Sequence, residues 1–321
     1  MRRISWMVFL MAGALWAQTE IPESARKLFE RGNEFVKKAS LPRAKVEYLK
    51  ALKAHPPFKD ALYNLAVVCE QLGQPDEAVT YYRQYLELSP TSADVWTQLG
   101  VLCDTTGRKA EAEAAYRKAL EGNPKFGRAH HNLGVLLEEQ KQYAEARTHL
   151  ENFVKLEEAA GRKNGDAYFS LGVFHLHRGR VREAKMLLQK SLDIDPTVVH
   201  YNNAMGDVYL AEKNPEVAAI HYRKAIEKDA KFALAYSGLG DTCRQLGQVE
   251  SASENYRKAL ELRADYDVVH YKLGLLYEEK QPAEAIKHFE KYLQSGTNLQ
   301  YQDEVQSKLT VLKQFHGNQQ P

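Results

Sequence analysis

Several side chains in this sequence are of the types that bind metals or catalyse reactions, but their spacing does not suit those roles. His175 and His177 are two residues apart, which would place both rings on one face of a strand but about 200° apart on a helix. Asp193 and Asp195 lack the glycine and the distal glutamate of a calcium-binding loop. The sequence has no phosphate-binding glycine loop with a lysine, no HExxH, no CxxC and no nucleophile elbow. It therefore predicts no enzyme, no metal site and no cofactor.

The elements that carry these residues are organised by an internal repeat. The hexapeptide YRKALE occurs at 116–121 and 256–261, and YRKAIE occurs at 222–227. The copies that begin at 222 and 256 are 34 residues apart. The copies that begin at 116 and 256 are 140 residues apart, which is four periods of 34 plus four residues. A fixed period of this length indicates a repeat array. Alignment gives eight units, which begin near Ala25, Lys59, Ala93, Gly127, Gly165, Val199, Ala233 and Asp267.

Each unit has the pattern of two amphipathic helices joined by a short turn. In the third unit the turn lies around 106–108, and Pro124 ends the second helix. Position 8 is glycine in seven units and position 20 is alanine in all eight, although glycine costs a helix about 0.5–1 kcal/mol relative to alanine. Small residues at both positions would let the paired helices approach closely, with the large residue at position 24, such as Tyr116, filling the outer gap. YRKALE is therefore a structural motif of the second helix.

These residues resemble the tetratricopeptide repeat, and the third unit fits its pattern with Trp96, Leu99, Gly100, Ala112, Tyr116, Ala119 and Pro124. The resemblance covers roughly residues 25–297. It implies an all-α fold, a right-handed α-solenoid of antiparallel helix hairpins whose first helices line a concave groove. After the last unit, Val305, Leu309 and Leu312 stand at helical spacing. We expect a capping helix over 298–315, which repeat arrays need to cover their last apolar face, and a disordered tail over 316–321.

Four extra residues separate the fourth and fifth units, in a stretch that contains Gly161 and Gly165. They predict a division into repeats 1–4 at residues 25–160, an insertion at 161–164, and repeats 5–8 at 165–297. The insertion is either a hinge or an overhang of the preceding helix, and the sequence favours neither.

The first seventeen residues differ in kind from the repeats. MRR is followed by the apolar run Ile4–Trp16 and by Ala17, which indicates a secretory signal peptide over 1–17. The run is shorter than the roughly 20 residues that span a bilayer, although an uncleaved membrane anchor is the alternative. We expect an exported chain, periplasmic or extracellular, with no membrane span after cleavage. Loss of Arg2 and Arg3 from 44 basic residues would leave 42 against 42 acidic ones, and no basic block indicates nucleic-acid binding.

The repeat register also interprets the three cysteines. Cys69, Cys103 and Cys243 all occupy position 11, where the family has a large core residue. Cys69 and Cys103 would lie on stacked hairpins about 8–10 Å apart, which exceeds the separation of about 7 Å that a disulfide tolerates. We interpret all three as buried core cysteines.

The remaining candidate site is a surface. Positions 2, 5, 9 and 12 of the first helices share one helical face, which in the family lines the groove where extended peptides usually bind. These 32 positions hold nine acids and three arginines, a net charge of −6. Position 9 is valine in four consecutive units, with acids at position 12 in three of them. The candidate partner-binding groove comprises Tyr63, Val67, Glu70, Asp94, Val101, Asp104, His131, Val135, Glu138, Asp166, Phe169 and Val173.

An acidic and apolar groove suits an extended or helical segment of a partner protein that carries apolar side chains with Lys or Arg beside them. The alternative is that the valines pack against neighbouring hairpins and the acids only solvate the face. The sequence thus favours a non-catalytic protein–protein interaction scaffold. The alternative function is a structural subunit of an envelope or secretion assembly that makes contact through its convex face and the ends of the array.

Overall fold

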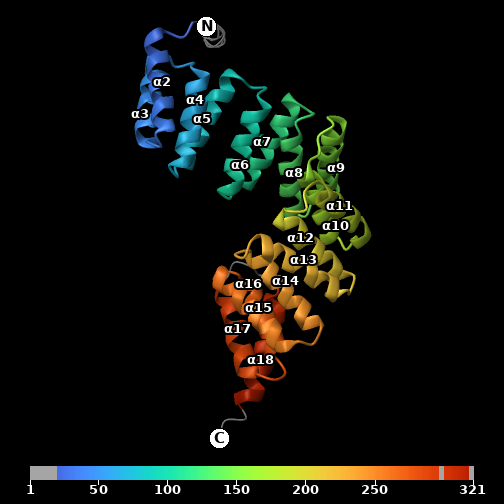
Figure 1. The fold of residues 1–321 in the computed structure, drawn as a ribbon. Coiled ribbons are helices and arrows are strands. Elements are labelled where there is room, and N and C mark those ends of the chain that lie inside the picture. Colours follow the sequence, from blue (N-terminus) through green and yellow to red (C-terminus); the bar gives the residue numbers. More distant parts are fainter. Residues whose placement is uncertain (1–19, 296–299, 318–321) are drawn as a thin grey trace, which may run out of the picture. The chain divides into compact units, whose positions relative to one another are not determined.

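The computed structural model describes residues 20–295 and 300–317, with only the backbone described for 315–317. Within these residues the chain forms seventeen helices and no strand (Figure 1). The all-α fold of antiparallel helix hairpins that the sequence predicts is confirmed. The predicted signal peptide, residues 1–17, lies outside the described residues.

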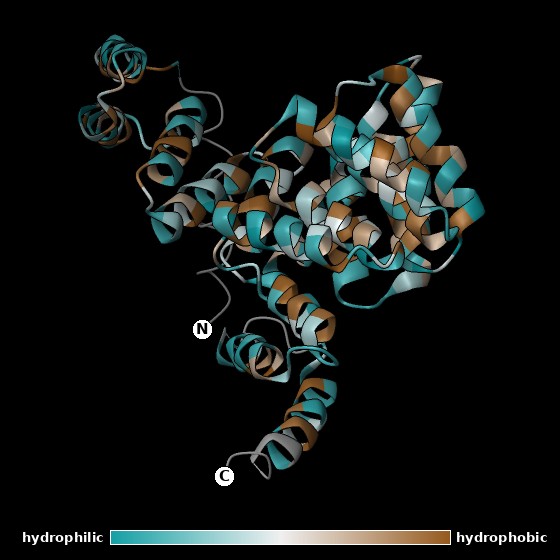
Figure 2. Ribbon diagram, turned by 60° about the horizontal axis from the view of Figure 1, so that its bottom comes forward, coloured by the Kyte–Doolittle hydropathy of each residue, from teal (hydrophilic) through white to brown (hydrophobic). Residues whose placement is uncertain are grey.

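The contacts divide the chain into two units between Ala160 and Gly161. Unit 1 contains α2 (Glu23–Lys37) with α3 (Leu41–Ala54), α4 (Lys59–Gln71) with α5 (Pro75–Leu88), α6 (Ala93–Thr105) with α7 (Lys109–Gly122), and α8 (Gly127–Glu139) with α9 (Tyr143–Ala159). Unit 2 contains α10 (Gly165–His177) with α11 (Val181–Ile194), α12 (Val199–Ala211) with α13 (Pro215–Lys228), α14 (Ala233–Gln245) with α15 (Val249–Leu262), α16 (Asp267–Tyr277) with α17 (Pro282–Ser295), and α18 (Gln302–Gly317). Within each unit, consecutive helices pack against one another. Hydrophobic and hydrophilic segments alternate along these helices (Figure 2), as expected of amphipathic helices that each bury one side.

The four extra residues between the fourth and fifth hairpins mainly lengthen a helix. α9 has 17 residues, whereas α5 and α7 have 14 each, a difference of three. Gly161 follows it with a φ of 66°, in the left-handed region that commonly ends a helix. Three of the four extra residues thus lengthen α9, and the connection to α10 lies at 160–164.

A large side chain at position 24 lies directly on the glycine at position 8 of the same hairpin. A Cβ atom on Gly100 would stand 2.4 Å from Cε1 of Tyr116, and one on Gly206 would stand 2.6 Å from Cε1 of Tyr222. A side chain at either glycine would collide with the ring. The second hairpin combines Tyr82 with Ala66 at position 8, so this close contact belongs to the hairpins that have glycine there. The expectation that position 24 fills an outer gap is wrong, because Tyr116 is only 1% exposed. The ring is the centre of the hairpin core.

The turn inside most hairpins uses one residue in the left-handed region. Gly73, Gly107, Gly179 and Gly247 have φ values of 69°, 77°, 69° and 72°. Lys213 occupies the equivalent position of the sixth hairpin with a φ of 59°. This conformation brings Cβ of a residue other than glycine close to the following carbonyl oxygen, so the turn between α12 and α13 carries local strain.

We expect Lys213→Gly to stabilise the protein by about 1 kcal/mol, because glycine adopts the left-handed region without the steric penalty. A shift of the urea midpoint to higher concentration at unchanged slope would measure this gain. The same exchange inside α13, Lys224→Gly, serves as the control and should destabilise by about 1 kcal/mol. A midpoint that falls for Lys213→Gly would contradict the assignment of strain to this turn.

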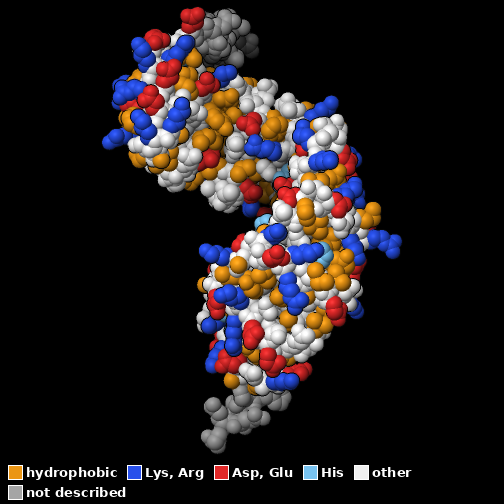
Figure 3. Space-filling model, viewed as in Figure 1, with side chains coloured by type: hydrophobic (Ala, Val, Ile, Leu, Met, Phe, Trp, Pro, Cys, Tyr) orange, Lys and Arg blue, Asp and Glu red, His pale blue; other side chains and the backbone are white. Residues whose placement is uncertain are grey.

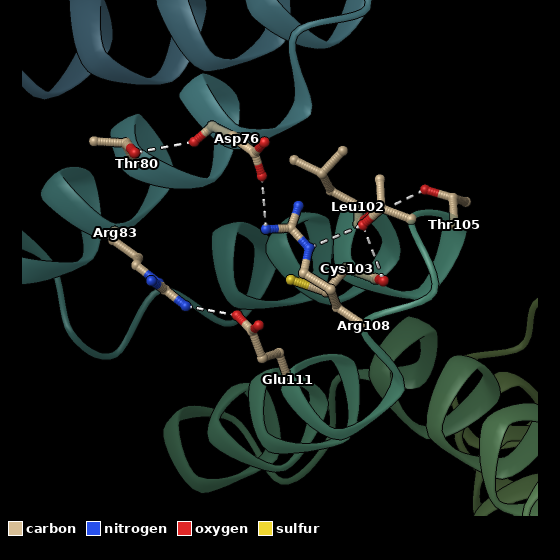
Figure 4. Close-up of polar contacts among 9 residues, drawn as sticks. Asp76, Thr80, Arg83, Leu102, Cys103, Thr105, Arg108 and Glu111 are labelled. Atoms are coloured by element: carbon tan, nitrogen blue, oxygen red, sulfur yellow. Dashed lines mark hydrogen bonds and ion pairs between the residues drawn. The ribbon is translucent and has the colours of Figure 1, made fainter.

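Ion pairs between second helices join neighbouring hairpins. In unit 1, Arg83 of α5 points at Glu111 of α7 across 2.6 Å, and Arg108 reaches Asp76 of α5 at 3.2 Å (Figure 4). Exposed pairs of this kind contribute only about 0–1 kcal/mol each. The hairpin cores therefore supply most of the stability, and these pairs lie at the surface between hairpins.

The last helix covers the end of unit 2. Val305 and Leu309 of α18 are 0% and 4% exposed and pack in one cluster with residues of α16 and α17. Lys308 binds Glu278 at 2.8 Å. The helix runs from Gln302 through Gly317, two residues beyond the expected end of the cap at 315. Residues 318–321 lie outside the described part of the chain.

Candidate functional site

The predicted groove face of unit 1 exposes a row of valines. Val67 lies on α4, Val101 on α6 and Val135 on α8. Val101 and Val135 are each 37% exposed, and Val67 is half-buried. α6 and α8 contact each other directly. Two of the three valines are thus open to solvent on neighbouring helices, rather than buried against the next hairpin.

Several of the acids beside this row are bound to cations of the same unit. Asp104 forms an ion pair with Lys109 at 2.6 Å, and Lys109 also pairs with Glu139 at 2.6 Å. Asp94 binds Arg128 at 3.2 Å. Because Lys109 belongs to a second helix, a count of first-helix positions omits it. The charge of −6 counted from those positions therefore overstates the local field.

Glu70 lies one helical turn from Val67 and is half-buried. Burial raises the pKa of its carboxyl group, although a hydrogen bond with Tyr82 opposes that shift. A carboxylate that is disfavoured by burial gains free energy from a nearby cation. A basic partner side chain beside Glu70 would therefore stabilise its carboxylate.

The other predicted residues of unit 1 pack against aromatic rings. Tyr63 lies 6.0 Å from the ring of Tyr82 and 6.2 Å from that of Tyr85, measured between ring centroids. His131 lies 5.1 Å from the ring of Phe153. Glu138 is half-buried on α8, one turn from the exposed Val135. These side chains line the valine row without forming a catalytic arrangement.

The remaining predicted residues, Asp166, Phe169 and Val173, lie on α10 in unit 2. Phe169 and Val173 pack against the hydrophobic cluster of α11 and α12. Asp166 accepts a hydrogen bond of 2.5 Å from the hydroxyl of Tyr201. The structure thus divides the twelve candidate residues between two units, and in unit 2 the packing alternative for the valine holds.

Unit 2 contains a polar site that the sequence analysis did not single out. Asp207 of α12 accepts hydrogen bonds from Tyr222 at 2.5 Å and from the amide of Asn203 at 3.3 Å. Burial raises the pKa of Asp207 to about 6. Asn203 Oδ1 is buried without a hydrogen-bond partner in the described part of the chain. Asp241 of α14, whose charge also raises the pKa of Asp207, is paired with Lys272 at 2.5 Å.

We expect Asp207→Asn to raise the free energy of unfolding at pH 7.5. A carboxyl whose folded pKa is raised from 3.8 to about 6 contributes full stability below pH 3.8 and loses it as the pH rises through 6. The gain should therefore disappear at about pH 4, which chemical denaturation at both pH values would test. Asp60→Asn, at an exposed position of α4, is the control. Equal gains at the two pH values would contradict the role of ionised Asp207.

Two pairs of histidines bridge the helices of their hairpins. His130 and His149 place their Nδ1 atoms 2.8 Å apart, and His270 and His288 place theirs 3.0 Å apart. Short sequence spacing does not reveal either pair, because the partners are 19 and 18 residues apart in the sequence. Two imidazoles alone do not make a metal site, and the described residues contain no group of three or more possible metal ligands.

Acidification should destabilise unit 2 through His288. Burial, followed by the charge of His270, lowers the pKa of His288 from 6.5 to about 4, with Lys291 and Arg257 acting in the same direction and Glu284 opposing them. Since the unfolded chain binds the proton more readily, stability present above pH 6.5 is lost as the pH falls toward 4. We expect His288→Gln to flatten this part of the pH–stability curve. An unchanged slope relative to wild type would contradict the assignment.

The cysteines are all free and buried, as the repeat register predicts. Burial raises the pKa of the Cys69 thiol to about 11 and also raises that of Cys103. Thiols of this kind are poor nucleophiles at neutral pH because little thiolate is present. Separately, no helix in the described ranges combines the length and apolar character that crossing a membrane requires.

Comparison with family models gives matches over most of the hairpins. Models described as tetratricopeptide repeats match residues 29–93, 142–198 and 269–295, and a model described as a TPR repeat matches 240–281. A model described as the middle TPR-like domain of cilia and flagella-associated protein 70 matches 62–165.

Comparison with individual proteins gives both a sequence relative and structural ones. The type IV pilus assembly protein PilF of Pseudomonas aeruginosa is 33% identical over 136 residues, which are 41% of this chain and 54% of that protein. The chain therefore matches only about half the length of this relative. The crystal structure of a tetratricopeptide repeat protein from Parabacteroides merdae matches with a TM-score of 0.66 at 20% identity, over 79% of this chain and 99% of that one. The structure of pilF from Pseudomonas aeruginosa matches with a TM-score of 0.56 at 23% identity, over 70% and 97% of the two chains. These structural likenesses concern the fold.

Proposed function

We propose that this chain, which is a tetratricopeptide-repeat protein, is a non-catalytic scaffold that binds a segment of a partner protein on the first-helix face of unit 1. The observation that carries the proposal is the row of Val67, Val101 and Val135 on α4, α6 and α8, two of them more than a third exposed. Contiguous exposed apolar side chains with charged neighbours mark interaction surfaces more often than chance exposure does.

The chemistry of the partner follows from what surrounds the row. Apolar side chains of an extended or helical segment would cover the valines, and a Lys or Arg would pair with the half-buried Glu70, whose pKa burial raises. The rest of the surface favours no single sign: in Figure 3, charged side chains of both signs are interspersed with hydrophobic ones on the face shown. Because the face is built on packed helices, binding would cost little ordering of the scaffold.

A cell-envelope setting extends this proposal. The relative that this chain matches over about half of the relative's length is named a type IV pilus assembly protein. The N-terminal residues of this chain have the pattern of a secretory signal. We therefore propose that the scaffold belongs to an exported, envelope-associated assembly. The same relative favours the second candidate function, a structural subunit of such an assembly that acts through faces other than the valine row.

Site-specific photo-crosslinking in the native host distinguishes these two candidates. A photoreactive residue at 101 or 135 should capture one predominant partner, and capture at 101 should be lost in Val135→Asp and weakened by high salt. A photoreactive residue at 46 is the matched control, because Val46 is also an exposed valine, at 48%, but belongs to the second helix α3. Capture at 46 with none at 101 or 135 would overturn binding on the valine row and favour the structural subunit.

A further inference from the structure

Unit 1 also contains an apolar pocket between the second helices of its second and third hairpins. The pocket has a volume of about 520 Å³ and is lined by α5, α6 and α7. Leu86, Trp96, Leu99 and Cys103 form its apolar part. Trp96 and Val101 are both on α6 but five residues apart, which at 100° per residue separates them by about 140° around the helix. The pocket is therefore distinct from the valine row.

The lining of the pocket includes the smallest residue that any hairpin has at position 23. Ala115 lines it from position 23 of the third hairpin. The equivalent position of every other hairpin holds a larger residue, namely Glu47, Tyr81, His149, Leu187, His221, Asn255 and His288. In the third hairpin the space that such a side chain would fill lies next to Trp96 and Cys103.

A second pocket lies at the equivalent place beside the sixth hairpin, where His221 occupies position 23. It has a similar volume, about 550 Å³, but His221, Asn202 and Lys224 are among the residues that line it. The apolar character of the pocket in unit 1 is therefore specific to its side chains and does not follow from hairpin packing alone.

The indole of Trp96 is held in a fixed position. Its Nε1–H donates a hydrogen bond of 2.8 Å to the carbonyl oxygen of Pro90, so the polar atom of the ring is satisfied and its remaining surface is apolar. A fixed aromatic wall presents contact area with little loss of side-chain entropy on binding. Large apolar side chains of a partner are the groups that gain most from such a wall.

The rim of the pocket supplies charge. Arg83 and Glu111 face each other across 2.6 Å at one edge (Figure 4), and Lys118 is paired with Glu121 at 2.6 Å. Glu87 is exposed, lines the pocket, and has no ion pair in the described part of the chain. The one rim charge left without a counter-ion is thus an anion.

We propose that this pocket is a second docking site, which receives one aromatic or leucine side chain from an amphipathic helix of a partner protein. The helix carries a Lys or Arg one turn from that side chain, and this cation pairs with Glu87. A helix fits because residues three or four apart share one face, so one apolar anchor and one cation reach the pocket and its rim together.

A displayed library of 16-residue amphipathic peptides, selected against the full chain, tests the proposal. We expect the recovered peptides to share a large apolar residue with Lys or Arg three or four positions away. A consensus peptide should bind Ala115→Leu at least tenfold more weakly, because the leucine occupies space beside Trp96 that the anchor side chain needs, and Glu87→Lys at least threefold more weakly. Ala110→Leu, the same exchange at an exposed position of α7 outside the pocket lining, should bind as wild type does. Leu187 occupies the register of Ala115 in the fifth hairpin, so the filled variant should fold, and circular dichroism checks this.

Trp96 gives an optical readout at the site itself. The chain has three tryptophans, so substitution of Trp6 and Trp16 by Phe leaves Trp96 as the sole indole, and the consensus peptide should shift its emission. Binding that persists in Val101→Asp separates this site from the valine row, so the two proposals can fail independently. Recovered peptides that bind Ala115→Leu as tightly as wild type, or a selection that yields no binder, would overturn the docking site. Self-association of the chain that Ala115→Leu abolishes would assign the pocket to a second copy instead.

Discussion

The contact between the ring at position 24 and the glycine at position 8 determines much else in this protein. In the hairpins that have glycine at position 8 the ring or leucine stands where a Cβ atom would be, as Tyr116 does on Gly100, whereas the second hairpin combines Ala66 with Tyr82. The contact also has a chemical consequence, because a buried tyrosine hydroxyl needs a hydrogen-bond partner. Tyr48 donates to Asn33, Tyr222 to Asp207 and Tyr256 to Asp241, and each acceptor stands at position 9.

Position 9 is therefore coupled to the core. Where leucine replaces the tyrosine, as Leu150 and Leu188 do over Gly134 and Gly172, position 9 needs no acceptor and is Val135 or Val173. In the second hairpin Tyr82 bonds to Glu70 at position 12 instead, and Val67 stands at position 9. The residue at position 9 thus follows the ring in most hairpins, whereas the third hairpin combines Tyr116 with Val101 and departs from this coupling.

The fold could be predicted from the sequence because its determinants are local and periodic. The expected unit starts from Lys59 to Asp267 are the first residues of α4, α6, α8, α10, α12, α14 and α16. The candidate surface was predicted less completely, since its charges depend on contacts across helices. Lys109 neutralises Asp104 from a second helix, and His130 meets His149 from 19 residues away, so counts along a first helix include neither. The apolar pocket did leave a signal, the alanine that breaks the pattern at position 23.

The contact of most rings with a glycine of the same hairpin has a consequence for how such a chain can change over generations. A duplicated or deleted 34-residue segment carries the residues at positions 8, 9 and 24 together, so gene-level recombination between repeats would preserve the contacts among these three positions. Position 23, by contrast, differs between hairpins, as Glu47, Tyr81 and Ala115 show. A single step from a bulky residue to alanine there, as at Ala115, alters the outer surface of one hairpin while its neighbours keep theirs. The residues that close each hairpin and the residue that shapes its outer pocket are thus at different positions of the repeat.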